Sequence, residues 1–97
     1  MKENKYKIKS TYVIRNIIGE NILIPTDEEA QNKDSVILNE TALFICSFIK
    51  DKYATKSEII DEVIKNYNID YKTAKKDVSE ILDYFLTLSV LEENTNN

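Results

Sequence analysis

Hydrophobic and polar positions divide the chain into a strand-rich beginning and a helical remainder. β-Branched and aromatic residues crowd residues 10–18 and 21–24, with Gly19 between the two segments and Pro25 after the second. Such residues favour the half-buried surface of a sheet, and proline suits a strand end because it has no N–H for the ladder. The pattern therefore predicts a β-hairpin that ends near Pro25.

A short apolar run then leads directly into an amphipathic segment. Residues 35–38 form a predicted third strand, and Asn39 is a typical N-cap for a helix that extends to Asp51. A three-stranded antiparallel sheet has edge strands, whose N–H and C=O groups are unpaired on one side. The breadth of the apolar face predicts that this helix packs between the sheet and another helix.

Two further helices are predicted downstream. Thr55 and Glu58 have the spacing of a capping box, so a second helix begins near Lys56. Asp70 is the predicted cap of a third helix that runs to about Ser89. Three strands followed by three helices describe an α+β domain of winged-helix type. The helical stripes consist of Ile59, Ile60, Val63, Ile64 and Tyr67 in the second helix and Ala74, Val78, Ile81, Leu82, Phe85 and Ser89 in the third.

The two ends of the chain lack a clear period. Residues 1–11 are predicted to be a flexible N-terminal arm, and residues 93–97 a disordered polar tail. The 97 residues fit one domain. We therefore expect a single domain at residues 12–92.

The chain lacks most of the residues on which catalytic and metal sites usually depend. The chain has no histidine, one glycine and one cysteine, Cys46. Histidine is the commonest general base and metal ligand, a structural zinc site needs several Cys or His ligands, and a phosphate loop needs several glycines. We therefore expect no enzyme activity, no metal and no cofactor, with Cys46 as a buried thiol on a helix face.

Charge and hydropathy limit the partners. The net charge of −4 disfavours nucleic acid, whose recognition relies on Lys and Arg. The start of the chain has no signal peptide pattern, and no segment reaches the about 20 apolar residues of a membrane helix, so we expect a cytoplasmic protein without a membrane partner. A winged-helix DNA-binding protein is one alternative, because Lys72, Lys75 and Lys76 lie in the third helix, although Asp77 and Glu80 are interleaved with them. A protein adaptor is another.

Several features occur in a fixed order along the chain: Arg15, Gly19 and residues 22–25 in the hairpin, then Leu38-Asn39, Ala42, Thr55, Glu58-Ile59, Tyr67, Asp77-Val78, Phe85-Leu86 and Leu88. In these features the chain resembles, over about residues 12–92, the PqqD-like family, also called RiPP recognition elements. Cys46, Asp51 and Ser89-Val90 depart from the family pattern, and these departures concern packing and turns.

The resemblance implies a peptide chaperone that binds the leader of a ribosomally synthesised precursor peptide and presents it to a modifying enzyme. That enzyme would be a radical iron–sulfur enzyme, a leader protease with a cyclase or a quinone-pathway enzyme, and the sequence leaves the choice open. The leader would add to the third strand, Ser35, Val36, Ile37 and Leu38, and lie against one flank of the third helix, Asp77, Ile81, Tyr84 and Leu88, with Lys76 and Glu80 nearer the rim.

Two further expectations concern partners of the free domain. An unpaired edge strand allows either a monomer or an edge-strand dimer. The acidic loop with Asp27, Glu28 and Glu29 is the candidate for the surface that faces the enzyme. From pattern alone, two other interpretations explain the same residues. Ile81 and Leu88 would pack on the second helix while Asp77, Glu80 and Tyr84 face solvent, and the acidic loop would simply be solvated.

Overall fold

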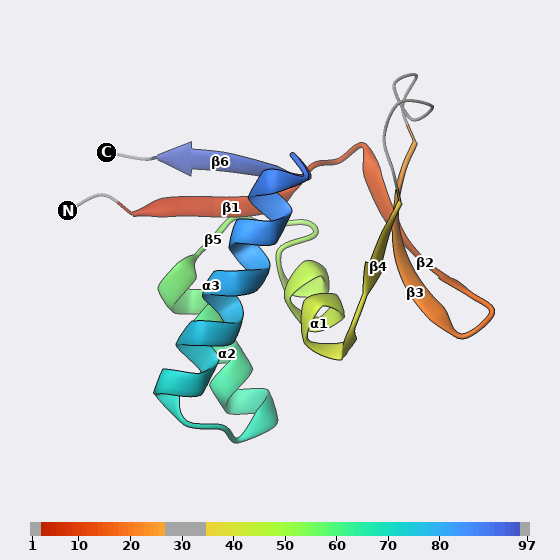
Figure 1. The fold of residues 1–97 in the computed structure, drawn as a ribbon. Helices are drawn as coiled ribbons and strands as arrows, with labels where there is room; N and C mark the ends of the chain where they lie inside the picture. The colour runs from red at the N-terminus through yellow and green to blue at the C-terminus, as the bar shows by residue number, and fades with distance from the viewer. Residues whose placement is uncertain (1–2, 27–34, 96–97) are drawn as a thin grey trace.

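The computed structural model describes residues 3–26 and 35–95, which form three helices and two three-stranded antiparallel sheets (Figure 1). The α+β class, the three helices and the three-stranded sheet before them are confirmed, whereas the winged-helix likeness stays a prediction. The predicted acidic loop lies outside the described residues. The strands are β1 (Asn4–Ile8), β2 (Tyr12–Ile17), β3 (Glu20–Pro25), β4 (Val36–Leu38), β5 (Ala54–Thr55) and β6 (Leu91–Thr95), and the helices are α1 (Glu40–Phe48), α2 (Lys56–Tyr67) and α3 (Tyr71–Thr87).

The predicted hairpin is the start of the sheet β2-β3-β4. Its strands meet at Ile18 and Gly19, whose φ angles of 50° and 81° both lie in the left-handed region. Two such residues between paired strands make the tight turn that matches the twist of a hairpin. The sheet presents Tyr12, Leu23, Val36 and Leu38 to the core, and each is almost completely buried. Strand β4 is the last strand in this sheet, so one of its edges has no neighbouring strand among the described residues.

The second sheet contains the two ends of the chain. Strand β1 lies between β5 and β6, and it pairs with β6 from Asn4 opposite Thr95 to Ile8 opposite Leu91. The prediction of a flexible arm is therefore wrong for residues 4–8, and that of a disordered tail is wrong for residues 93–95. Each strand alone is polar and without a clear period. Pairing between opposite ends of the chain makes both stable, and it buries Ile8 completely.

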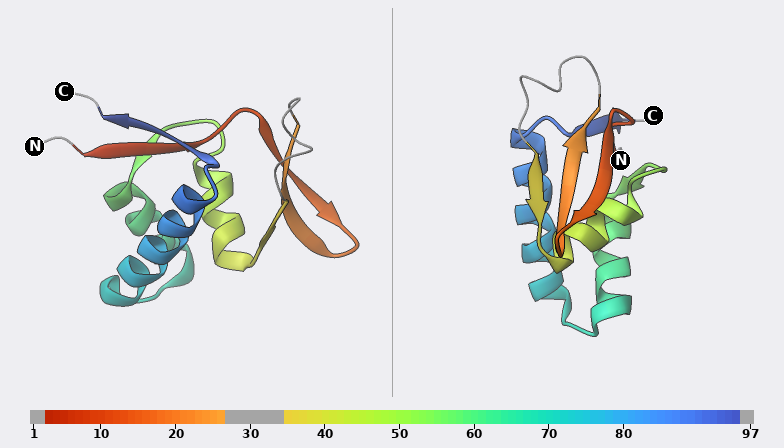
Figure 2. Two further views of the ribbon diagram at one scale, coloured as in Figure 1. Left: turned by 45° about the horizontal axis from the view of Figure 1, so that its top comes forward. Right: turned by 90° about the vertical axis from the view of Figure 1, so that its right-hand side faces the viewer.

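Helix α1 is the central element of the core. It lies between the sheet β2-β3-β4 and the helices α2 and α3 (Figures 1 and 2), as the width of its apolar face predicted. Ile45, Cys46 and Ile49 have no exposed surface. The helix ends at Phe48, three residues before the predicted end, and Ile49 is its C-cap.

All three helices begin after the predicted N-cap residues, and two of these three residues cap their helix through the side chain. The Oδ1 atom of Asn39 accepts the backbone N–H of Ala42 at 2.8 Å, and Thr55 forms the predicted capping box with Glu58. The backbone N–H of Thr55 donates to the Glu58 carboxylate and lowers the pKa of that group. Asp70 occupies the cap position of α3, but its side chain makes no capping hydrogen bond.

The substitution Ile8→Ala tests whether the N-terminal strand belongs to the fold. Removing buried methyl groups from a site with no exposed surface is expected to lower the free energy of unfolding by about 2–5 kcal/mol. Ile37→Ala is the matched control, because the Ile37 side chain is 64% exposed and its truncation leaves no cavity. Urea denaturation measures both variants. An Ile8→Ala protein as stable as the wild type would return residues 4–8 to the status of a flexible arm.

The substitution Ile18→Asn is expected to stabilise the protein. A β-branched residue is strained at φ 50°, whereas Asn-Gly is a favoured pair for this turn. Relief of the strain is worth about 1 kcal/mol, which raises the Tm of a domain of this size by about 4–8 °C. Ile17→Asn, on the adjacent strand residue, is the control and should give no gain. Equal or lower Tm for Ile18→Asn would contradict the strained turn.

Candidate peptide-binding groove

Strand β4 presents main-chain groups at the free edge of its sheet. The two-residue turn makes Ile17 and Glu20 a hydrogen-bonded pair, so alternate residues of β3 bond to β2 and the others bond to β4. Val36 and Leu38, opposite Leu23 and Asn21, therefore bond to β3. The N–H and C=O of Ile37 point away from the sheet, and no strand among the described residues lies beside them.

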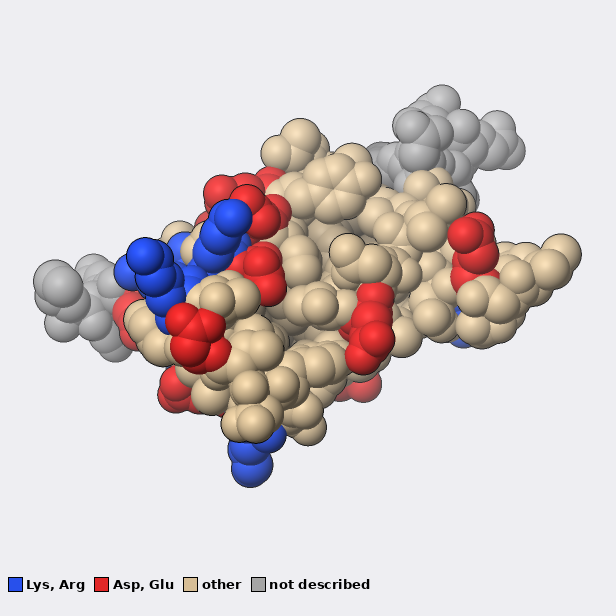
Figure 3. All heavy atoms as spheres, turned by 60° about the horizontal axis from the view of Figure 1, so that its bottom comes forward, with Lys and Arg blue, Asp and Glu red and all other residues tan. Residues whose placement is uncertain are grey.

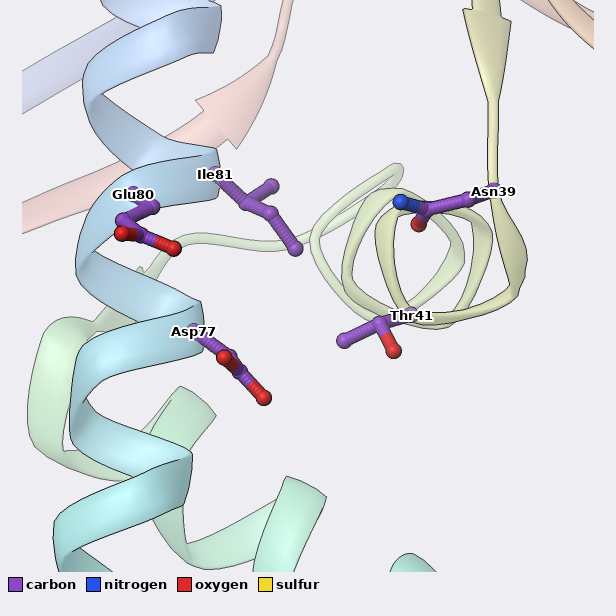
Figure 4. A pocket seen from close by; sticks show the side chains of 5 residues that line it. All are labelled: Asn39, Thr41, Asp77, Glu80 and Ile81. Atoms are coloured by element: carbon purple, nitrogen blue, oxygen red, sulfur yellow. The ribbon is translucent and has the colours of Figure 1, made fainter.

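Helix α3 lies on the side of β4 that faces away from β3 (Figure 2, right). Between α3 and the first turn of α1, which directly follows β4, is an open hollow of about 230 Å³. Asn39 and Thr41 line it on one side, and Asp77, Glu80 and Ile81 line it from α3 (Figure 4). We call the β4 edge together with this hollow the groove.

The groove combines hydrogen-bonding, acidic and apolar surface. The Oδ1 atom of Asn39 caps α1, which leaves its amide nitrogen as a donor, and Figure 4 shows this nitrogen directed toward α3. In the described part of the chain, the carboxylates of Asp77 and Glu80 have no hydrogen-bond or ion-pair partner. Ile81 provides an apolar wall beside them. This arrangement suits a guest that has a cationic group next to an apolar side chain.

The wider electrostatics agree with such a guest. The chain carries a net charge of −4. On the face shown in Figure 3, acidic side chains are spread over the surface, and a cluster of basic side chains lies at the left of the view, with another basic side chain at the lower edge. The field around the molecule therefore attracts basic peptides more than polyanions.

On the strand side, the predicted site residues divide by orientation. The side chains of Val36 and Leu38 are 4% exposed and belong to the core, so these residues have no side chain free for a guest. Ile37 points its side chain to the outer face of the sheet and its main chain to the free edge. Ser35 is exposed and precedes the strand.

On the helix side, three of the predicted residues meet at the hollow. Asp77, Glu80 and Ile81 line it. Tyr84 and Leu88 continue the same flank of α3 toward its C-terminal end, where Tyr84 is 54% exposed. Lys76 is exposed and does not line the hollow. Ile81 and Leu88 also pack against the core, so both carry a structural role beside any role in binding.

Two lining residues, Asn39 and Thr41, were not predicted. Asn39 was interpreted only as a helix cap, although a cap that directly follows an edge strand must lie beside that edge. Thr41 gave no sequence signal, because its place depends on how the first turn of α1 faces α3.

The free thiol of Cys46 is buried in the core. Burial raises the pKa of the Cys46 thiol to about 12, against a smaller opposite effect of Lys50. Among residues 3–26 and 35–95, no cluster of His, Cys, Asp and Glu can hold a metal ion. Within the same residues, no helix has the length and hydropathy that crossing a membrane requires.

Comparison with known proteins decides the family. The model of the family described as "Coenzyme PQQ synthesis protein D (PqqD)" matches residues 24–91, well over half of the chain. The chain belongs to the PqqD family. A search of curated proteins gives no match for this PqqD family member.

A solved structure shares the fold of this PqqD family member. It is described as "TbiB1 in Complex with the TbiA(beta) Leader Peptide", and the superposition has a TM-score of 0.70 at 22% sequence identity. The alignment covers 89% of this chain and 94% of TbiB1. The resemblance therefore includes nearly the whole of both folds.

The buried thiol gives a test of the core beside the groove. At about pH 8 a thiol with a pKa near 12 is almost entirely protonated, so iodoacetamide should not label Cys46 in the native protein and should label it fully in urea. A Cys46→Ala, Ser47→Cys variant is the control, because residue 47 on the same helix is exposed. Rapid labelling of the native wild type would contradict the packing of α1.

Proposed function

We propose that this protein captures the leader segment of a ribosomally synthesised precursor peptide and presents it to a modifying enzyme, without catalysing a reaction itself. The leader adds as a fourth strand to β4 and lies against α3. The observation that supports this most directly is the free edge at Ile37 beside a hollow with two unpartnered carboxylates, Asp77 and Glu80. Family membership and the leader complex of TbiB1 support the same function.

Because β4 has only three residues, its edge can supply only part of the binding free energy of a leader, and α3 must supply the rest. Only Ile37 offers both an N–H and a C=O at the centre of the three-residue edge, so few main-chain hydrogen bonds form. A net hydrogen bond is worth about 0.5–1.5 kcal/mol, which is too little for micromolar affinity from the edge alone. Side-chain contacts with α3 must supply the remainder. Selectivity therefore resides on α3 and in the hollow.

The hollow predicts the chemistry of the leader. In an added strand, every second side chain faces the same way. The side chains that face α3 would include a Lys or Arg opposite Asp77 and Glu80 and an apolar residue two positions away, against Ile81. A cation that approaches two carboxylates in a partly desolvated groove gains charge-assisted hydrogen bonds.

Titration of a fluorescent leader from the precursor peptide encoded beside this protein tests the proposal by anisotropy. Asp77→Lys is expected to weaken binding by about tenfold or more, because it places a cation opposite the leader cation. Asp61→Lys is the matched control, since it makes the same charge change at an exposed position on α2. Wild-type protein that is folded and binds no neighbouring leader would overturn the proposal.

The edge is tested separately with proline. Ile37→Pro removes an N–H that points out of the sheet and should weaken leader binding by up to about tenfold, the worth of one main-chain hydrogen bond, while the far-ultraviolet circular dichroism is retained. Val36→Pro removes an N–H that bonds to β3, so it should lower stability instead. Full leader affinity in Ile37→Pro would exclude strand addition at β4.

A further inference from the structure

The outer face of the sheet β2-β3-β4 is apolar and is not covered by any other described element. Because side chains alternate along a strand and Tyr12, Leu23 and Leu38 point inward, the residues between them point outward. Figure 2 (right) shows this face toward the viewer, with the helices behind it. The outward residues are Val13, Arg15, Ile17, Glu20, Ile22, Ile24 and Ile37.

Exposure on this face is large for a small domain. Ile17 is 45% exposed, Ile37 is 64% exposed, and Ile18 at the hairpin tip is 98% exposed. Contiguous exposed apolar surface marks an interaction site more often than scattered single residues do. Ile18 is also held at φ 50°, where asparagine or glycine would be less strained. The fold gains nothing from an isoleucine there, which points to a contact outside the domain.

Two charged residues lie on this face, Arg15 in its central row and Glu20 opposite Ile17 beside the hairpin turn. Arg15 is the only arginine in the chain, and it lies in one cross-strand row with Ile22 and Ile37. Within the described part of the chain, its guanidinium donates only to the carbonyl oxygen of Ile14, at 3.0 Å. Arginine surrounded by apolar residues is typical of interface hot spots, because its planar fork binds a carboxylate with two hydrogen bonds. The partner of this face therefore presents a carboxylate within an apolar surface.

A second copy of the chain carries a carboxylate on this face, Glu20, but face-to-face stacking does not bring it over Arg15. Copies stacked face to face about a two-fold axis through the central row would place Arg15 over the other Arg15 or over Ile37. Three strands about 4.8 Å apart and about 20 Å long also cover only about 300 Å². A stable interface buries about 800 Å² on each partner, so the face suits a transient partner that contacts neighbouring surface as well.

The leader provides that neighbouring surface. A strand added to β4 would continue the sheet beyond Ile37, and its other side chains would join the outer face. The face is then largest when a leader is bound. A partner that docks on this face therefore binds the domain with a bound leader more tightly than the domain without one.

We infer that the outer face around Arg15 and Ile18 is the docking surface for the modifying enzyme. The isoleucines contact an apolar surface of that enzyme, and Arg15 binds one of its carboxylates. This inference rests on the proposed function and replaces the acidic loop at residues 27–29 as the candidate enzyme-facing surface.

Biolayer interferometry with the purified modifying enzyme encoded beside the precursor, in the presence of saturating leader, tests the inference. Arg15→Glu is expected to weaken enzyme binding by about tenfold or more. It replaces the cation by a carboxylate, which would repel the carboxylate of the enzyme in an apolar setting. Lys65→Glu makes the same charge change at an exposed position on α2 and should leave enzyme binding unchanged. Leader affinity, measured by anisotropy, should remain that of the wild type in both variants.

Ile18→Asn separates docking from folding. It should weaken enzyme binding while it raises Tm, a combination that damage to the fold cannot produce. Enzyme binding that is absent in the wild type, or unchanged in Arg15→Glu and Ile18→Asn, would overturn the inference even if the leader still binds. Sedimentation could also show that the wild type is a dimer and that Arg15→Glu is a monomer. That result would overturn the inference, because a second copy of the chain would then occupy the face. Failure of the wild type to bind leader would instead overturn the proposed function.

Discussion

Asn39 joins strand β4 to helix α1 without a loop, and the rest of the fold depends on this direct connection. Its Oδ1 atom accepts the N–H of Ala42, so the residue that ends the edge strand also begins the central helix. Helix α1 is anchored by Ile45, Cys46 and Ile49, which have no exposed surface. An edge strand tied directly to the core cannot swing away from α3. The groove is therefore preformed, which reduces the entropy that a peptide loses when it binds.

The sheet β2-β3-β4 assigns a different task to each of its surfaces. Its inner face, with Leu23 and Leu38, holds the core together. In the proposed function its free edge at Ile37 receives a peptide, and in the further inference its outer face receives an enzyme. One three-residue strand contributes to all three, since Val36 and Leu38 point inward while Ile37 offers its main chain to the edge and its side chain to the outer face. Period-two alternation is what allows so short a segment to serve three surfaces.

Local sequence patterns predicted the elements whose signals are local. The capping box at Thr55 and Glu58, the cap at Asn39 and the hairpin turn at Gly19 all follow from adjacent residues, and the structure contains each of them. The sheet formed by β1, β5 and β6 was missed, because its partners lie at opposite ends of the chain and each strand is polar when considered alone. Thr41 was missed for a related reason. Its position opposite Asp77 results from the packing of α1 beside α3, which no short window of sequence contains.

An unpaired edge beside an apolar face creates a risk of self-association, and the charges of this chain oppose it. Strand β4 has only three residues, which limits the ladder that a second copy could form. Asp77 and Glu80 stand beside the edge, and a copy with a net charge of −4 would approach them unfavourably. A basic peptide meets the opposite field at the same place. The carboxylates that would select a cationic leader thus also discourage pairing between copies, so one pair of side chains serves both recognition and solubility.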